Sequence, residues 1–178
     1  MRYPDFYDQA PSITMYDPLA RFLGAVEGGI IEYRYADAVK VAGHSCPTVA
    51  SAWLMTARAL EALYPKDVAE RGAVRVGFQE DSTSGVTGVI ANVVSLITGA
   101  TQDTGFKGLA GRFDRRNLLF FNDAVGGEIL FTRKDSGAAV EVAAHLQHVP
   151  GDPRMRELMS VCVAGHATYE MQHEFGRL

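Results

Sequence analysis

One amphipathic stretch constrains the fold more than any other feature of the sequence. Residues 47–63 read PTVASAWLMTARALEAL, with apolar side chains at helical spacing, a proline at the first position and Pro65 just beyond the end. The pattern predicts a single helix over residues 47–63 with its apolar face in a core.

The rest of the chain alternates helical patterns with short β-branched runs. Helices are predicted from Asp17-Pro18 to about Gly28, over residues 30–42, 85–97 and 153–164, and again from Thr168. Strands are predicted over residues 74–78, 118–122, 128–133 and 138–144, and we expect them to form an antiparallel meander. This order predicts an α+β fold in one domain, a small antiparallel sheet packed with helices.

The N-terminal residues differ from this pattern. Residues 1–16 are rich in Pro, Tyr and Asp and show no periodicity, so we expect an arm that lies on the surface or on a partner subunit. Residues 17–178 are then the domain proper, and its length is ordinary for one hydrophobic core.

Charge and hydropathy restrict the partners. The net charge of −4 argues against a binder of nucleic acid or of an anionic membrane, because such proteins carry a basic excess that attracts phosphate. No stretch reaches the roughly 18 uninterrupted apolar residues of a membrane span, and the N-terminal residues do not resemble a secretion signal. We therefore expect a cytoplasmic protein that binds small molecules or other proteins, with Cys46 and Cys162 as free thiols or metal ligands.

The sequence GHSCP at positions 43–47 places two soft ligand groups close together, His44 and Cys46. Pro47 at the first helical position puts Cys46 at or next to the N-cap, where the positive end of the helix dipole favours the thiolate. In an extended H-x-C segment the imidazole can reach the sulfur, and the two groups together suit zinc, nickel or cobalt. The alternative is that Cys46 is a small core residue and His44 caps a nearby carbonyl group.

Other ligand-type residues form less specific patterns. Cys162 and His166 have helical spacing, but Gly165 is a natural helix terminator, so we expect them not to share a face. The loop at 80–85, with Glu80 and Asp81, could hold an anion or direct a carboxylate toward a metal, or it is a solvated turn.

A basic cluster lies at the end of the glycine-rich loop over residues 99–116. Arg112, Arg115 and Arg116 surround Asp114 and could hold a carboxylate or phosphate, although a surface ion-pair cluster is the more common arrangement. We expect the isolated histidines to be surface or capping residues; these are His145, His148 and His173.

Several motifs, taken in order, resemble those of the FmdE-like family, which is named after formylmethanofuran dehydrogenase. GHSCP and the helix after it resemble the family motif GHxCP, and LITGAT at 96–101 resembles the family's helix end LTGCT. FTRKDSGAAVEV at 131–142 resembles its hairpin RxDTGKAxRV, and AGHATYEMQHEFGRL at 164–178 resembles its tail SGEATxEExxEFxxLW. The resemblance covers most of the chain from about residue 31.

The resemblance implies an α+β fold, a homodimer, and a metal ion, zinc or another divalent transition metal such as nickel, near His44 and Cys46. Members are described as metal-binding proteins, some of them associated with molybdenum or tungsten formylmethanofuran dehydrogenase. That redox activity is not expected of this chain, which has no cysteine clusters for iron–sulfur centres.

This sequence departs from the family pattern at two positions. Ala100 stands where the family has a second cysteine, and Asn92 stands where an aspartate falls. A metal at the GHSCP turn would then be completed by Glu80, Asp81, Asn92 or His145, by a partner chain, or by water.

The leading hypothesis is a metal-binding protein that acts on or senses a small molecule through His44 and Cys46; whether it is an enzyme is left open. An incomplete set of protein ligands favours an exchangeable or catalytic site over a structural one. One alternative is a metal-free enzyme with Cys46 as nucleophile and His44 as base. Another is a non-enzymatic subunit that docks through the aromatic residues of the N-terminal arm, Tyr3, Phe6, Tyr7 and Tyr16.

Overall fold

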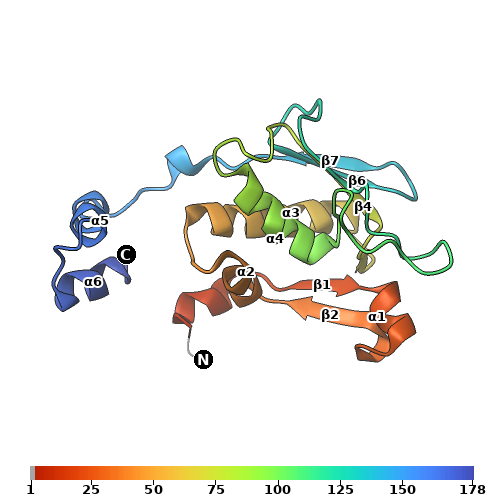
Figure 1. Ribbon diagram of the computed structural model, residues 1–178, viewed down its shortest axis with the longest axis horizontal. Coiled ribbons are helices and arrows are strands. Elements are labelled where there is room, and N and C mark those ends of the chain that lie inside the picture. The colour runs from red at the N-terminus through yellow and green to blue at the C-terminus, as the bar shows by residue number, and fades with distance from the viewer. Residues whose placement is uncertain (1–2) are drawn as a thin grey trace. The chain divides into compact units, whose positions relative to one another are not determined.

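The computed structural model describes residues 3–178, and the chain divides into two compact units, Met1–Ala144 and His145–Leu178. The first unit has the α+β fold that the sequence predicted (Figure 1). Its helices are α1 (Pro18–Leu23), α2 (Tyr35–Ala42), α3 (Pro47–Leu63) and α4 (Thr87–Thr98), with 3₁₀ turns at Asp5–Gln9 and Glu27–Gly29. Its strands are β1 (Ile13–Tyr16), β2 (Ile30–Tyr33), β3 (Ala69–Glu70), β4 (Val74–Phe78), β5 (Leu119–Phe120), β6 (Ile129–Arg133) and β7 (Ala139–Val142).

Helix α3 confirms the prediction made from its amphipathic pattern. It begins at Pro47 after an extended Cys46, and the chain leaves the helix at Tyr64. Its apolar face is buried, and Trp53 has no exposed surface. The Trp53 indole N–H, the one polar group of this buried side chain, donates a hydrogen bond to the carbonyl oxygen of Pro11 (2.9 Å).

A four-stranded sheet has the order β5-β4-β6-β7. As predicted, β6 pairs antiparallel with β4 and with β7. The expectation for β5 was wrong, because β5 pairs parallel with β4. The chain passes from β4 to β5 through helix α4, and such a crossover returns it in the same direction.

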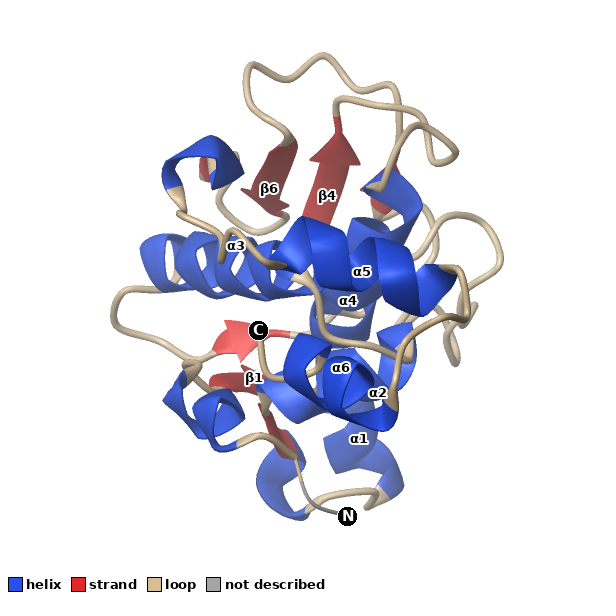
Figure 2. Ribbon diagram, turned by 90° about the vertical axis from the view of Figure 1, so that its left-hand side faces the viewer, coloured by secondary structure: helices blue, strands red, loops and turns tan. Residues whose placement is uncertain are grey.

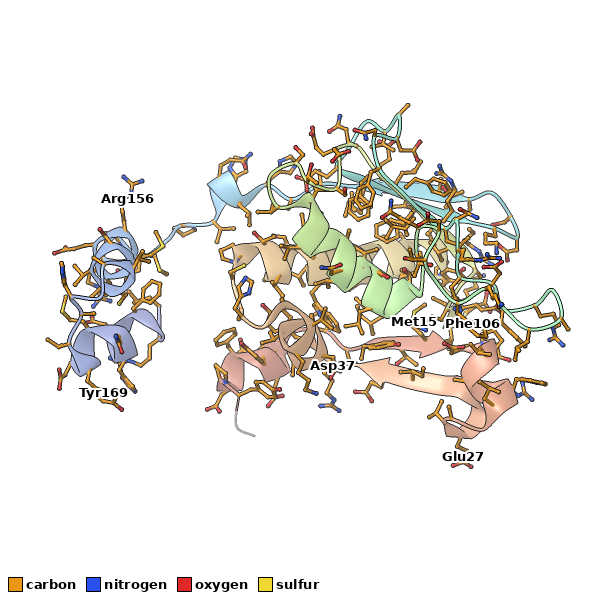
Figure 3. The ribbon with its side chains drawn as sticks, viewed as in Figure 1. Met15, Glu27, Asp37, Phe106, Arg156 and Tyr169 are labelled. Carbon is orange, nitrogen blue, oxygen red and sulfur yellow. The ribbon has the colours of Figure 1, made fainter. Side chains whose placement is uncertain are left out.

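A second sheet, with the order β2-β1-β3, was not predicted. Its middle strand is β1, in which Ile13 and Met15 are buried while Thr14 between them is exposed. Figure 3 labels Met15 on the side of β1 toward the helices. The last four residues of the expected arm therefore lie in a sheet, because their alternation brings two apolar side chains into the core.

The aromatic residues of the expected arm also have partners within the chain. The Tyr7 ring meets the buried Tyr35 edge to face at 4.9 Å, and Tyr16 pairs with Ile30 in the sheet. The Phe6 ring meets that of Tyr7 edge to face at 4.8 Å, although Phe6 is 56% exposed. These contacts tie the segment to its own unit.

The predicted helix over residues 30–42 is divided in two. Residues 30–33 form β2, which pairs antiparallel with β1, and α2 starts only at Tyr35. Arg34 between them is extended (φ −118°, ψ 156°). The β-branched and aromatic side chains of β2 favour a strand once β1 provides an edge, and this non-local pairing overrides the helical pattern.

Helices α3 and α4 lie between the two sheets, as Figures 1 and 2 show. The largest side chains without exposed surface, or with almost none, come from all of these layers: Trp53, Phe78, Phe131, Met15, Ile97 and Ile129. Helix α2 contacts both α3 and α4. The connection between α2 and α3 is therefore held by packed helices at both ends.

The second unit is helical. It contains a 3₁₀ turn at Leu146–His148, α5 (Met155–Val163) and α6 (Tyr169–Phe175). As predicted, Gly165 (φ 73°) separates the two helices, and the Thr168 hydroxyl caps α6 by accepting a hydrogen bond from the Met171 N–H (3.3 Å). No feature of the sequence predicted the division after Ala144. Among the described residues, no helix has both the length and the hydropathy needed to cross a bilayer.

Candidate functional site

The candidate site lies in the short connection between α2 and α3. Gly43 ends α2 in the left-handed conformation (φ 77°), and its N–H donates to the carbonyl oxygen of Val39. Cys46, extended at φ −154° and ψ 170°, is the N-cap residue of α3. This backbone path brings His44 and Cys46 to the same side of the connection, as the sequence predicted.

The two side chains are in contact. The Nε2 atom of His44 lies 3.3 Å from the Sγ atom of Cys46. The other ring nitrogen, Nδ1, lies 2.9 Å from the carbonyl oxygen of Ala42. Because a carbonyl oxygen only accepts, Nδ1 carries a proton, and in the neutral ring Nε2 has the free lone pair. The imidazole therefore caps a carbonyl group, as the alternative interpretation of His44 expected, and faces the sulfur at the same time.

The surroundings favour a charged pair. Partial burial raises the pKa of the Cys46 thiol, but the backbone N–H groups of Val49 and Thr48, together with His44, lower that pKa below its usual value. These N–H groups lie at the N-terminus of α3, where the positive end of the helix dipole also favours a thiolate. The pKa of His44 is raised, first by its hydrogen bond to Ala42 and then by Cys46. Both changes stabilise a thiolate beside an imidazolium.

Two neighbouring residues were not among the candidates from sequence. The hydroxyl of Ser45 lies 2.9 Å from the hydroxyl of Tyr35, which is buried. Burial raises the pKa of Tyr35, so its hydroxyl stays protonated and can donate to Ser45. The Tyr35 ring also packs edge to face against Trp53 at 6.1 Å. Ser45 could have been predicted as a site residue because it lies between the two predicted ligands in the sequence. Nothing in the sequence indicated that Tyr35 would lie near them.

The other predicted ligands are not grouped with this pair. Among residues 3–178, no three His, Cys, Asp or Glu side chains lie together so that they could hold a metal ion. The N–H and hydroxyl of Thr83 (2.9 and 2.7 Å) and the Asn122 amide (3.0 Å) donate to the carboxylate of Asp81 and hold its pKa at about 2. Glu80 accepts a hydrogen bond from the Ser84 hydroxyl (3.0 Å). Both carboxylates thus accept hydrogen bonds from the turn itself and, for Asp81, from Asn122, which fits the solvated turn that was one of the two interpretations of this loop.

The remaining candidates have separate surroundings. Asn92 is exposed on α4 at the border of a pocket of about 520 Å³. His145 belongs to the second unit, where its ring lies 6.4 Å from that of His148. His166 follows the end of α5 in a turn, so it does not share a helical face with Cys162, as predicted.

Fold and site together define an α+β protein with a histidine and a cysteine in contact at a helix N-terminus, a pair that can ligate a soft metal ion or act as base and nucleophile. A family model described as "FmdE, Molybdenum formylmethanofuran dehydrogenase operon" matches residues 41–177, a range that includes the whole GHSCP motif. The chain belongs to this family, which confirms the resemblance of its motifs. Comparison with curated proteins found no significant match, and neither did comparison with solved structures.

Proposed function

We propose that this protein binds a divalent transition metal, zinc or a similar ion such as nickel, through His44 and Cys46, and that it acts on or senses a small molecule there. The observation that carries the proposal is the 3.3 Å separation of Nε2 and Sγ, with Nδ1 of the same ring held by the Ala42 carbonyl group. A histidine that ligates a metal through one nitrogen almost always donates from the other to a carboxylate, a carbonyl oxygen or water. The ring is therefore oriented as a metal ligand is.

The separation of the two donor atoms suits a tetrahedral site. Zinc bonds of about 2.05 Å to nitrogen and about 2.3 Å to sulfur place such ligands roughly 3.6 Å apart. The observed separation is 3.3 Å, so a small outward movement of the exposed His44 ring would admit the ion. Cys46 is half-buried and the pKa of its thiol is lowered, which favours the thiolate that a metal ion needs as its anionic ligand.

Two protein ligands leave the other positions of a tetrahedral ion to be filled. In our proposal they are taken by a second copy of the chain, by water and by the small molecule. The homodimer expected from the family fits this arrangement because the second copy can supply a ligand. Bound at such a site, the metal would supply Lewis acidity, while His44 and Cys46 hold it and leave exchangeable positions open.

Elemental analysis of the full-length protein, purified without chelators, tests this function. We expect stoichiometric metal in the wild type and in Cys162→Ala, and its loss in His44→Ala and in Cys46→Ala. Cys162→Ala is the matched control because it removes the other of the two cysteines. Metal that persists in Cys46→Ala, or a wild type without stoichiometric metal, contradicts the proposal.

A metal-free cysteine-dependent activity is the second candidate. It is supported by the contact of Nε2 with Sγ and by the opposite pKa changes of the two groups. His44 would take the thiol proton, and the thiolate would attack an electrophilic carbon of the small molecule, displacing a leaving group that receives the proton from the imidazolium. Alkylation of chelator-treated protein with iodoacetamide, followed against pH, tests this second candidate. Alkylation of the thiolate well below pH 8 without metal supports the metal-free candidate, and a lack of such alkylation below about pH 8 rules that candidate out.

A further inference from the structure

A second group of charged residues lies where α1 begins, and it shares no residue with the His44–Cys46 pair. Asp17 is only 4% exposed, and its carboxylate accepts a hydrogen bond from Arg115 (2.8 Å) and one from Arg71 (3.1 Å). Arg115 is likewise only 4% exposed. Three segments far apart in the sequence thus bring two arginines to one buried carboxylate.

Positive charge is in excess in this cluster. The one buried carboxylate, that of Asp17, pairs with two guanidinium groups, and Glu70, which also lies near Arg115, is exposed and forms no salt bridge with it among residues 3–178. Nε and Nη1 of Arg115 and Nε of Arg71 are buried and have no hydrogen-bond partner among residues 3–178. Buried cations and donors of this kind are costly unless a counter-charge and acceptors are supplied.

The backbone is shaped to deliver Arg115 to this position. The N–H and hydroxyl of Thr101 donate to the Arg115 carbonyl oxygen (3.0 and 2.6 Å), and the Arg115 N–H donates to that of Phe106 (2.9 Å). A Cβ atom at Gly72 (φ +88°) would lie 2.3 Å from Nη1 of Arg115, and one at Gly99 (φ +70°) would lie 2.9 Å from it. Both positions therefore need glycine for this arginine to fit.

The loop that carries Arg115 is itself strained. Ala110, Phe113 and Asn117 have φ values of 47°, 65° and 54°, which residues with a side chain rarely adopt. Such conformations are energetically unfavourable and tend to occur at binding sites. The Phe113 ring packs against Phe22 of α1, with ring centres 5.5 Å apart. Figures 1 and 3 show this loop, on which Phe106 is labelled, at the end of the unit that carries α1.

Arg115 forms part of the wall of a pocket of about 500 Å³, large enough for a small molecule. Six of the lining residues are cationic or aromatic: Tyr16, Arg71, Arg112, Phe113, Arg115 and Lys134. The acidic lining residues are Glu70 and Asp114, and Arg116 pairs with Asp114 (2.8 Å). At the rim, neither Arg112 nor Lys134 has a salt-bridge partner among residues 3–178. The pocket is thus positive in a protein whose net charge is −4.

We propose that this pocket binds the oxyanion group, a carboxylate or a phosphate, of a small molecule. Guanidinium groups match such oxyanions in shape and charge, and donors in a partly enclosed pocket bind them more strongly than donors in water. The anion would be held between Arg71 and Arg115 on one side and Arg112 and Lys134 on the other. It would supply the negative charge that Asp17 alone does not.

Calorimetric titration of the full-length, chelator-treated protein with inorganic phosphate, and separately with acetate, tests the site. We expect saturable binding of at least one of them, weakened about tenfold by Arg112→Gln and by Lys134→Gln. Both residues are exposed, so these variants should fold, which circular dichroism checks. The two titrations distinguish the source: phosphate alone indicates a phosphorylated ligand, and acetate alone indicates a carboxylic acid.

Arg58→Gln is the matched control. It removes the same charge from an exposed position on α3, outside the pocket, and should leave the affinity within about twofold of the wild type. Equal weakening in all three variants would mean unspecific attraction to surface charge and would overturn the proposal, as would a lack of saturable binding of both anions. Cys46→Ala should bind the anion as the wild type does, so failure of the metal proposal leaves this test intact.

Discussion

Replacing Asp17 by alanine should destabilise the protein more than the loss of any exposed charge. The Asp17 carboxylate caps α1 by accepting from the N–H groups of Leu19 (2.9 Å) and Ala20 (3.0 Å), and it also pairs with Arg115 and Arg71. Loss of an N-cap costs about 1 kcal/mol, and removal of one partner from a buried ion pair costs about 3–5 kcal/mol. These effects overlap, so we expect the free energy of unfolding to fall by about 3–5 kcal/mol.

Urea unfolding followed by fluorescence measures this change. Trp53 is the single tryptophan and has no exposed surface, so its emission reports on the core directly. The control is Glu61→Ala, which breaks the Arg58–Glu61 pair (2.7 Å) between side chains 74% and 69% exposed and should cost about 0.5 kcal/mol at most. Asp17→Asn should lie between the two, since asparagine keeps the cap but loses the charge. If Asp17→Ala costs no more than Glu61→Ala, the reasoning about the buried cluster is wrong.

Three further results are expected. Burial raises the pKa of Asp17, but its hydrogen bond from the backbone and the charge of Arg115 lower that pKa by more, so it lies below the usual 3.8. The stability that the Asp17 charge contributes is therefore present above pH 3.8 and is lost as the pH falls below it. The difference in urea midpoint between wild type and Asp17→Asn should therefore shrink as the pH falls below about 4. Gly72→Ala should lower the unfolding free energy by about 1–3 kcal/mol in the same assay, because its left-handed backbone is strained by a Cβ atom that also meets Arg115. His44→Gln should raise the pKa of the Cys46 thiol, seen as slower alkylation near neutral pH, and an unchanged rate would show that the imidazole does not stabilise the thiolate.

The elements predicted correctly are those whose signals are local. The start of α1 follows from Asp17 and Pro18, although the helix ends at Leu23 and not near Gly28 as predicted, and α3 follows from Pro47, an apolar face and Pro65. The hairpin of β6 and β7 is similarly fixed by its short turn. What could not be predicted depends on pairing between distant segments: the β1–β2 ladder, and the parallel direction of β5 beside β4. A single sequence does not state which strand edges meet.

The candidate sites follow the same rule. His44 and Cys46 could be predicted to converge because they are two residues apart next to a recognisable helix start. The contact between Asp17 and Arg115 spans 98 residues along the chain, and the sequence indicated only that the arginine cluster could hold an anion. Glu80 and Asp81 were predicted from residue type alone, and in the structure their oxygens accept hydrogen bonds from Thr83, Ser84 and the distant Asn122.

Titration with cobalt tests most directly whether His44 and Cys46 bind one metal ion together. Chelator-treated protein titrated with Co²⁺ should develop sulfur-to-metal charge-transfer absorption together with the visible bands of tetrahedral cobalt, in the wild type and in Cys162→Ala alike. The charge-transfer absorption should vanish in Cys46→Ser, and the tetrahedral bands should weaken in His44→Ala. A wild-type spectrum no different from that of Cys46→Ser would contradict the account.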